Sequence, residues 1–149
     1  MTKDKGSTDS IRVFFDSDVV ISALLSKSGA AAILTKLDSI ERIISSLSRL
    51  EIEGVSKRLD IPDRQVQSLI KTSFFETRLA QAAPGKFVHF AIDKNDAHIV
   101  AGAASSSVSF LVSYNTKDFR CDLIRSELGI VILKPGQLLQ YLRCMGLFS

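Results

Sequence analysis

The stretch "IRVFFDSDVVISALLS", residues 11–26, decides the fold, because an apolar run leads into two carboxylates and then back into apolar sequence. Residues 11–15 show no alternation of polar and apolar side chains, which is typical of a strand buried on both faces of a parallel sheet. Residues 19–25 have the apolar spacing of a helix. Asp16 and Asp18 are therefore expected at the carboxyl end of a buried strand, where open α/β sheets bind ligands.

The rest of the chain continues to alternate between strand and helix patterns. Further strands are predicted at residues 42–45, 86–92, 108–113 and 130–133. Further helices are predicted at residues 30–37, 46–59 and 63–83, from residue 95 and from residue 135. This order predicts an α/β fold of three layers, with about five mostly parallel strands between two layers of helices. We expect residues 1–10 to be a disordered polar tail and residues 11–149 to be one domain.

The composition limits the classes of protein that need to be considered. Of the 149 residues, 46% are hydrophobic, which supports a continuous core, and the net charge of +3 favours a polyanionic partner only mildly. The sequence has no leader and no apolar run near the roughly 20 residues of a membrane span, so we expect a cytoplasmic protein without a membrane partner. Cys121 and Cys144 have neither the spacing of a zinc site nor that of a disulfide framework.

Acidic side chains follow three of the predicted strands. They are Asp16 and Asp18 after the first strand, Asp93 and Asp96 after the third, and Asp118, with Asn115, after the fourth. Aspartate also caps helices, so each position has an ordinary explanation. A helical wheel places Asp96 on the apolar face with Ile99 and Val100, which predicts that Asp96 points inward and Asp93 is the cap.

A glutamate is expected to join these acids. The wheel for residues 46–59 places Glu51 within the apolar arc and Glu53 outside it. A buried charge is costly unless it is paired or binds a metal, so Glu51 either pairs with a cation such as Arg49, lies at an exposed edge, or belongs to the acidic cluster. Such a cluster persists only with protons or cations bound, and oxygen ligands alone favour Mg²⁺ or Mn²⁺.

Four motifs in this order resemble the PIN-domain nucleases, in particular their single-domain, VapC-like ribonuclease toxins. They are "FFDSDVVISALLS", "SLSRLEIEGVSKRL", "DAHIVAGA" and "LVSYNTKDF", and the resemblance covers residues 11–142. It implies that Asp16, Glu51 and Asp96 are metal-site acids, Asp118 a fourth acid and Asn115 a neighbour of the metal. Where the family most often has Asn, this chain has Asp18, which either tightens metal binding or points aside to cap the following helix.

The resemblance implies hydrolysis of RNA phosphodiesters that depends on Mg²⁺ or Mn²⁺. Asp16, Glu51, Asp96 and Asp118 would be the catalytic and metal-binding acids. Asn115, Asp18 and Thr116 would support them, while Lys94, Lys117 and Arg120 either contact phosphates or are ordinary solvated cations. A cognate antitoxin and a homodimer are implied as partners. The helix pair at residues 46–83, with Phe74, Phe75 and Leu79, offers them an apolar surface unless these side chains pack onto the sheet.

Two other functions remain open from the sequence. A PIN-like fold with an incomplete metal site could bind RNA or a protein without catalysis. A receiver-type signalling domain would use Asp93 as its phosphoacceptor, with Asp16, Asp18, Thr116 and Lys134 around it. The receiver hypothesis gives no role to Glu51, Asp96 or Asp118.

Overall fold

A computed structural model describes residues 10–78 and 83–148, so the predicted tail at residues 1–10 lies outside the described residues except for Ser10. Five parallel strands form one sheet in the order β3-β2-β1-β4-β5. The strands are β1 Ile11–Phe15, β2 Ile40–Ser45, β3 Phe75–Thr77, β4 Phe110–Val112 and β5 Val131–Leu133. The predicted α/β fold with a five-stranded parallel sheet is confirmed.

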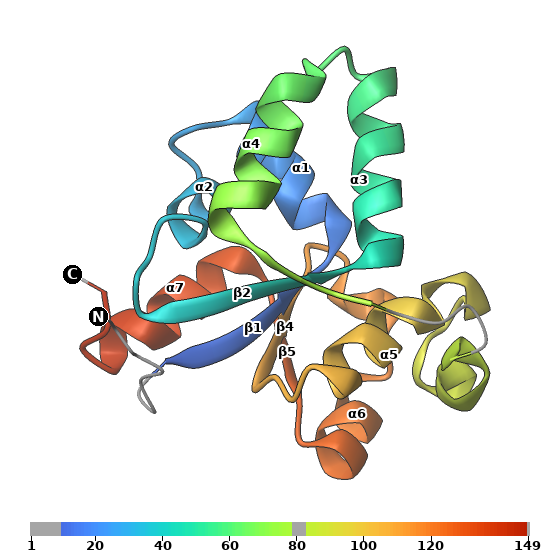
Figure 1. Cartoon of the computed structure of the whole chain (residues 1–149). Helices are drawn as coiled ribbons and strands as arrows, with labels where there is room; N and C mark the ends of the chain where they lie inside the picture. Colours follow the sequence, from blue (N-terminus) through green and yellow to red (C-terminus); the bar gives the residue numbers. More distant parts are fainter. Residues whose placement is uncertain (1–9, 79–82, 149) are drawn as a thin grey trace.

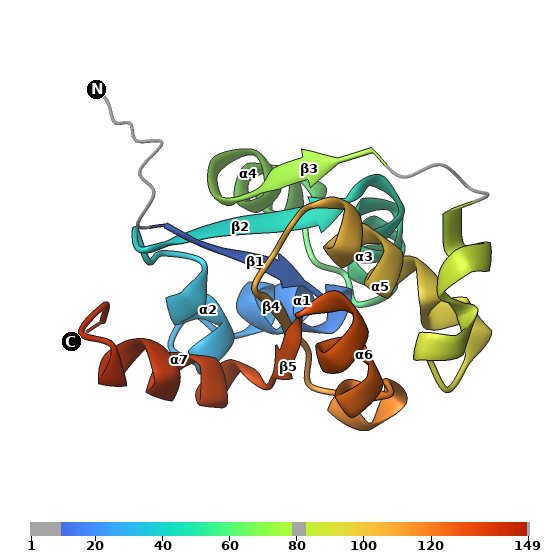
Figure 2. The same cartoon turned by 90° about the horizontal axis from the view of Figure 1, so that it is seen from below.

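Helices cover both faces of the sheet (Figures 1 and 2). One layer contains α1 Ser17–Leu25, α2 Ala30–Leu34, α3 Ser46–Arg58, α4 Asp63–Ser73 and α7 Pro135–Cys144. The other contains the 3₁₀ helix η1 Ala83–Phe90 with α5 Ala97–Ser105 and α6 Cys121–Leu128. No helix in the described parts of the chain has both the length and the apolar character needed to cross a membrane.

The central strand β1 contributes to both hydrophobic cores. Val13 and Phe15 pack into the core under α1, whereas Phe14 packs into the core under α5. Side chains alternate between the two faces of a strand, and here both faces are covered, so all three residues are apolar and fully buried. This explains why the opening stretch shows no alternation of polar and apolar residues.

The strand predicted at residues 86–92 is wrong. Residues 86–90 belong to η1, and Ala91 after it forms an isolated antiparallel β-bridge with Phe119. Phe87 and Phe90 are three residues apart, the repeat of a 3₁₀ helix, and their ring centroids lie 6.1 Å apart. Phe90 is buried in the core beside α5, so the aromatic residues that suggested a strand serve a helical turn instead.

The helix predicted at residues 63–83 is too long, because α4 ends at Ser73 and the edge strand β3 follows. Phe74 takes an extended backbone and packs edge-on against Phe15, with ring centroids 5.1 Å apart. Arg42 on β2 donates from Nε to the carbonyl oxygen of Ser73 at 2.7 Å, which satisfies one of the carbonyls left free at the helix end. Leu79 and the last part of the predicted helix lie outside the described residues, apart from Ala83, which belongs to η1.

The prediction that α3 buries its most apolar face is also wrong. This helix buries Ser48, Ile52 and Ser56, while Leu50 is 65% exposed and Glu51 is exposed. Serine side chains are small enough to let α3 lie against α1, so the buried face is not the most hydrophobic one.

Helix α6, which the sequence did not predict, ends at Gly129 with a φ of 72°, a left-handed conformation that suits glycine.

The strand order also argues against a receiver domain. Receiver-type sheets have the order 2-1-3-4-5, whereas this sheet has the order 3-2-1-4-5. Asp93 follows η1 rather than a strand, so it does not lie at the strand end that a phosphoacceptor would need. The chain therefore lacks the receiver-type strand order, and Asp93 does not occupy the position on which that hypothesis rests.

Candidate acidic site

The candidate site lies between β1 and β4, where the strand order of the sheet reverses. From these two adjacent strands the chain continues to opposite faces, through α1 on one side and towards α6 on the other. Open α/β sheets form a crevice at such a point, outside the carboxyl ends of the strands. Asp16 follows β1 and Ser113 follows β4, so both lie in this region outside the strand ends, which we call the crevice.

Asp16 is the most buried carboxylate of this crevice, with 7% of its surface exposed. Its Oδ1 accepts a hydrogen bond from the backbone N–H of Ser17 and caps α1, and its Oδ2 accepts from Ser113 Oγ, both at 2.8 Å. Burial, followed by the charges of Asp18 and Glu51, raises the pKa of Asp16 to about 7, although the two hydrogen bonds act to lower it. Asp16 therefore changes its charge near neutral pH.

Asp18 is half-buried and reaches across from α1 to the loop after β4. Its Oδ2 accepts from the backbone N–H of Tyr114 at 3.2 Å and from Asn115 Nδ2 at 3.0 Å. Its Oδ1 is buried and has no hydrogen-bond partner among the residues that the structure describes. Burial raises the pKa of Asp18, and the backbone N–H of Tyr114 opposes that rise. Since Asp16 caps α1, Asp18 instead ties the ends of β1 and β4 together.

Glu51 lies beside Asp16, although it is exposed. Its Oε1 accepts from Ser17 Oγ at 2.7 Å, and its charge raises the pKa of both Asp16 and Asp96. Glu53 belongs to a different network, where its Oε2 accepts from Arg49 Nε at 3.3 Å and from Gln67 Nε2 at 2.7 Å. The structure thus brings Glu51 rather than Glu53 to the other acids, but through an exposed helix face and not the apolar face predicted.

Asp96 and Asp118 come together through the antiparallel contact after η1. The backbone N–H of Ile92 donates to the carbonyl oxygen of Asp118 at 2.9 Å, which holds η3 Thr116–Asp118 against the segment that leads into η2 Lys94–Asp96. Burial is the largest cause that raises the pKa of the half-buried Asp96. The negative charges of Asp118, Asp93 and Glu51 also raise it. Asp93 Oδ1 accepts from the backbone N–H of Asn95 at 2.9 Å, so its predicted role as a cap is confirmed.

Two hydroxyl groups belong to this site that were not predicted from the sequence. Ser17 binds Glu51 and Ser113 binds Asp16, so each serine orients an acid from the adjacent strand end or helix start. Serine is too common for its position to have revealed this. Thr116 contributes its carbonyl oxygen, which accepts from Cys121 Sγ at 3.3 Å, while the predicted phosphate contacts Lys94, Lys117 and Arg120 are exposed.

The electrostatics of the acidic site (Asp16, Asp18, Glu51, Asp96 and Asp118) fit a hard cation. Within the described residues, no Lys, Arg or His forms an ion pair with any of these five acids. The same residues contain no group of three or more His, Cys, Asp or Glu already gathered around one cation position. The donors are oxygens only, and a buried oxygen of Asp18 lacks a partner, so the chemistry of the set suits Mg²⁺ or Mn²⁺.

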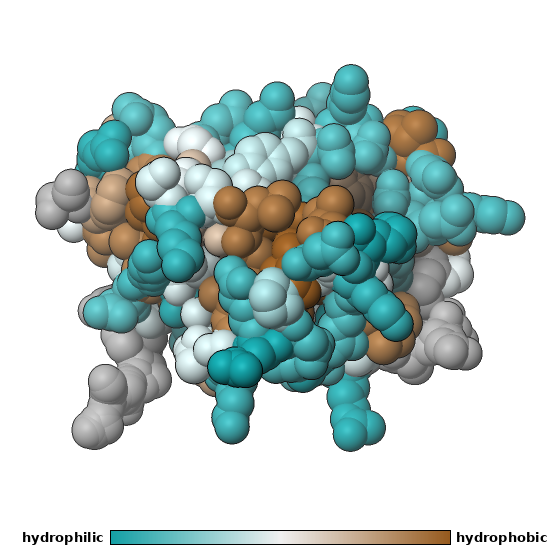
Figure 3. Space-filling view, turned by 90° about the horizontal axis from the view of Figure 1, so that it is seen from above, coloured by the Kyte–Doolittle hydropathy of each residue, from teal (hydrophilic) through white to brown (hydrophobic). Residues whose placement is uncertain are grey.

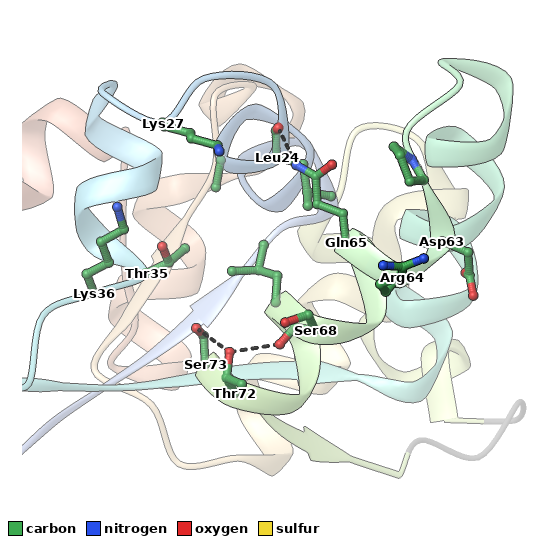
Figure 4. Close-up of a pocket in the computed structure, with 13 residues that line it drawn as sticks. Leu24, Lys27, Thr35, Lys36, Asp63, Arg64, Gln65, Ser68, Thr72 and Ser73 are labelled. Atoms are coloured by element: carbon green, nitrogen blue, oxygen red, sulfur yellow. Dashed lines mark hydrogen bonds between the residues drawn. The ribbon is translucent and has the colours of Figure 1, made fainter.

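A groove of about 1040 Å³, lined by none of these acids, lies between α1, α2 and α4. In Figure 4, Lys27 and Lys36 lie on one side of it and Arg64 and Gln65 on the other. Gln65 Nε2 donates to the carbonyl oxygen of Leu24 at 3.5 Å across one end. Figure 3 views the molecule from above and shows hydrophobic surface gathered in the middle of that face, with hydrophilic side chains around it.

These features define an open α/β protein with an acidic crevice at the switch point of its sheet. The model of the PIN domain family matches residues 12–117, more than half of the chain, and the chain belongs to this family. The resemblance predicted from the four motifs is thereby confirmed. The matched region includes Asp16, Glu51 and Asp96 and ends one residue before Asp118. A search of curated proteins found no relative with significant similarity.

Solved structures share this fold at low sequence identity. A chain of a toxin–antitoxin complex from Klebsiella pneumoniae is 19% identical, with a TM-score of 0.58 over 80% of this chain and 95% of its own. A chain of VapBC2 from Rickettsia felis, bound to a DNA fragment from its promoter, is 17% identical, with a TM-score of 0.57 over 83% and 98%. A chain of VapBC-1 from nontypeable Haemophilus influenzae is 12% identical, with a TM-score of 0.59 over 85% and 99%.

Proposed function

We propose that this protein is a ribonuclease that depends on Mg²⁺ or Mn²⁺ and hydrolyses RNA phosphodiesters. The observation that carries the proposal is the buried Asp16, whose pKa rises to about 7 beside Asp18 and Glu51. Burying like charges together is costly, and a divalent cation that neutralises them makes the arrangement favourable. Membership of the PIN domain family supports nuclease chemistry at this crevice.

Asp16, Glu51, Asp96 and Asp118 would hold the cation. Once bound, a divalent cation lowers the pKa of a water molecule and stabilises the charge that develops on a phosphodiester. Ser113 and Ser17 orient Asp16 and Glu51 through the hydrogen bonds described above. Asn115 keeps the loop after β4 at the crevice because its side chain donates to Asp18.

The exposed cations of the loops around the crevice would hold the substrate. Lys94 precedes Asp96 in η2, and Lys117 and Arg120 flank Asp118. None of the three forms an ion pair within the described residues, so their charges are free for the phosphates of RNA.

The partner that we propose is an antitoxin, and its binding segment would lie in the groove between α1, α2 and α4. We expect a peptide with apolar and acidic side chains to bind there. Ala23, Leu24 and Leu69 give the groove an apolar lining. The cations Lys27, Lys36 and Arg64 outnumber the acid Asp63 around it, which favours an acidic peptide. The toxin–antitoxin complexes that share this fold support such a partner. A Lys27→Glu, Lys36→Glu double variant should bind such a partner at least tenfold more weakly.

The phenylalanines predicted to form a dimer surface differ in their exposure. Phe74 packs against Phe15 and is partly buried, whereas Phe75 on the edge strand β3 is 66% exposed. A homodimer through this edge stays a prediction. Analytical ultracentrifugation of the protein and of Phe75→Ser checks it, and an unchanged dimer in the variant rules out this surface.

The proposed activity is tested with a labelled RNA and Mn²⁺. Asp16→Asn and Asp96→Asn should each lower cleavage at least a hundredfold, while Asp60→Asn, an exposed acid at the far end of α3, should cleave normally. Cleavage by both site variants at the wild-type rate refutes the proposal. RNA binding without cleavage, combined with no Mn²⁺ binding by calorimetry, instead supports the non-catalytic alternative.

A further inference from the structure

Tyr114 lies between two residues that contact the acids. Its neighbour Ser113 donates to Asp16 at 2.8 Å, and its other neighbour Asn115 donates to Asp18 at 3.0 Å. Both neighbours thus contact acids of the site through their side chains, whereas Tyr114 is 40% exposed. The mechanism proposed above leaves this aromatic side chain without a role.

The structure holds Tyr114 at two points on α1. Its backbone N–H donates to Asp18 Oδ2 at 3.2 Å, and its phenolic oxygen lies 3.2 Å from Ser22 Oγ in a hydrogen bond. Asp18 and Ser22 are four residues apart on the same face of the helix, so the ring is fixed along the side of α1 next to the acids. A free surface tyrosine would not need both contacts.

We propose that Tyr114 is a platform on which an unpaired nucleobase stacks, which places the adjoining phosphodiester at the acidic site. The inference rests on the proposed function. Aromatic side chains bind single-stranded RNA by stacking on its bases, and the base must first be out of a duplex. A base carries no charge, so stacking secures the substrate without adding a phosphate to a crevice rich in carboxylates.

The chain provides a matched control. It contains two tyrosines and no tryptophan, and the second tyrosine, Tyr141, is 39% exposed on α7, where its ring packs against Phe110 with centroids 5.0 Å apart. Tyr114→Trp or Tyr141→Trp thus creates a single fluorescent indole, at equal exposure, beside the acids or away from them.

The experiment titrates each tryptophan variant, in an Asp16→Asn background that prevents cleavage, with a single-stranded RNA oligonucleotide. The indole at position 114 should be quenched saturably by single-stranded RNA, and less by a duplex or by an oligonucleotide with abasic sites. The indole at position 141 should not respond. In binding assays, Tyr114→Ala should weaken affinity by about 5- to 150-fold, the range expected for one stacked base, while Tyr114→Phe should bind within about threefold of the parent.

The outcomes separate this inference from the proposed ribonuclease activity. No quenching at position 114, or equal affinity for Tyr114→Ala and the parent, overturns the stacking role even if Asp16→Asn has abolished cleavage. Quenching in a protein that never cleaves RNA retains the stacking site and refutes the activity. If Tyr114→Ala does not fold, the quenching of Tyr114→Trp, with Tyr141→Trp as its control, decides the question. With an active enzyme, Tyr114→Ala should lower kcat/KM by a similar factor, mainly through a higher KM.

Discussion

Ser113 donates a hydrogen bond to Asp16 across the junction of β4 and β1, with 2.8 Å between Oγ and Oδ2 and both side chains buried. This contact acts to lower the pKa of Asp16, but burial and the neighbouring acids outweigh it and raise the pKa to about 7. A single hydroxyl thus influences the pH at which Asp16 becomes a carboxylate that can bind a cation.

Ser113→Ala should move Mn²⁺ binding to higher pH. Without the hydroxyl, ionised Asp16 loses a charge-assisted hydrogen bond, so its pKa rises by about one unit and the cation competes less well with the proton. Calorimetric titration with Mn²⁺ at several pH values measures the midpoint pH, at which Mn²⁺ binding is half-maximal. Ser105→Ala is the control, because Ser105 Oγ donates to the carbonyl oxygen of Gly102 and touches no acid of the site. Equal midpoints in the two variants contradict the prediction.

Asp16 should also make the metal-free protein less stable as the pH rises. Its pKa is 3.8 in the unfolded chain and about 7 in the folded one, so the folded state holds the proton more tightly. The stability from this group is fully present below about pH 4 and is lost as the pH rises to about 7, by up to about 4 kcal/mol. The raised pKa values of Asp18 and Asp96 act in the same direction.

Urea unfolding in EDTA between pH 5 and 8 measures this loss. Asp16→Asn should show a much shallower decline and be more stable than the wild type at pH 8, whereas Asp60→Asn should follow the wild type. Mn²⁺ should restore stability at pH 8 and have little effect at pH 5, where Asp16 is protonated. A decline of equal steepness in Asp16→Asn means that other groups cause it.

Gly102 allows α5 to approach the sheet. A Cβ at this position would lie 2.7 Å from Phe14 Cζ and 3.4 Å from Ser45 Cβ, and Phe14 is fully buried. Gly102→Ala should therefore lower the free energy of unfolding by about 1–3 kcal/mol despite the better helix propensity of alanine. Gly54→Ala on the exposed side of α3, where the nearest atom is 4.0 Å away, should raise stability by up to about 1 kcal/mol. Thermal unfolding compares the two, and a gain in both shows that Phe14 moves aside freely.

The sequence predicted the centre of the sheet and the positions of the acids better than it predicted the edges. The strand at residues 11–15 was recognisable because both its faces are buried, and a parallel sheet brings the residues after β1 and β4 to one end. The third strand was missed because residues 63–83 read as one helix, while Phe74 and Arg42 stop α4 through contacts distant in sequence.

The acids were harder to place on their helices. The wheel for α3 assumed that the most apolar face is buried, but that helix buries two serines and leaves Leu50 exposed. Glu51 reaches the site because Ser17 binds it, a contact that no spacing in the sequence indicates. Local pattern located the acids along the chain, and only the packing of α3 against α1 brought Glu51 to Asp16.

Asp18→Asn tests the residue at which the PIN-domain resemblance leads us to expect asparagine. The amide oxygen can accept both bonds that Oδ2 accepts, from Tyr114 N–H and Asn115 Nδ2, so the loop should stay in place. Loss of the charge removes a repulsion that raises the pKa of Asp16, and Mn²⁺ binding should therefore extend to lower pH.

Asp18→Ala serves as the comparison for this substitution, because it removes the same charge together with both hydrogen bonds. It should shift the pH dependence similarly but weaken binding at every pH, since Asn115 is no longer held. The decisive measurement is Mn²⁺ affinity at pH 8.5, where Asp16 is ionised in all three proteins. Equal affinity of Asp18→Asn and the wild type makes Asp18 a positioning residue, whereas a tenfold or greater loss means that its unpartnered Oδ1 binds the cation directly.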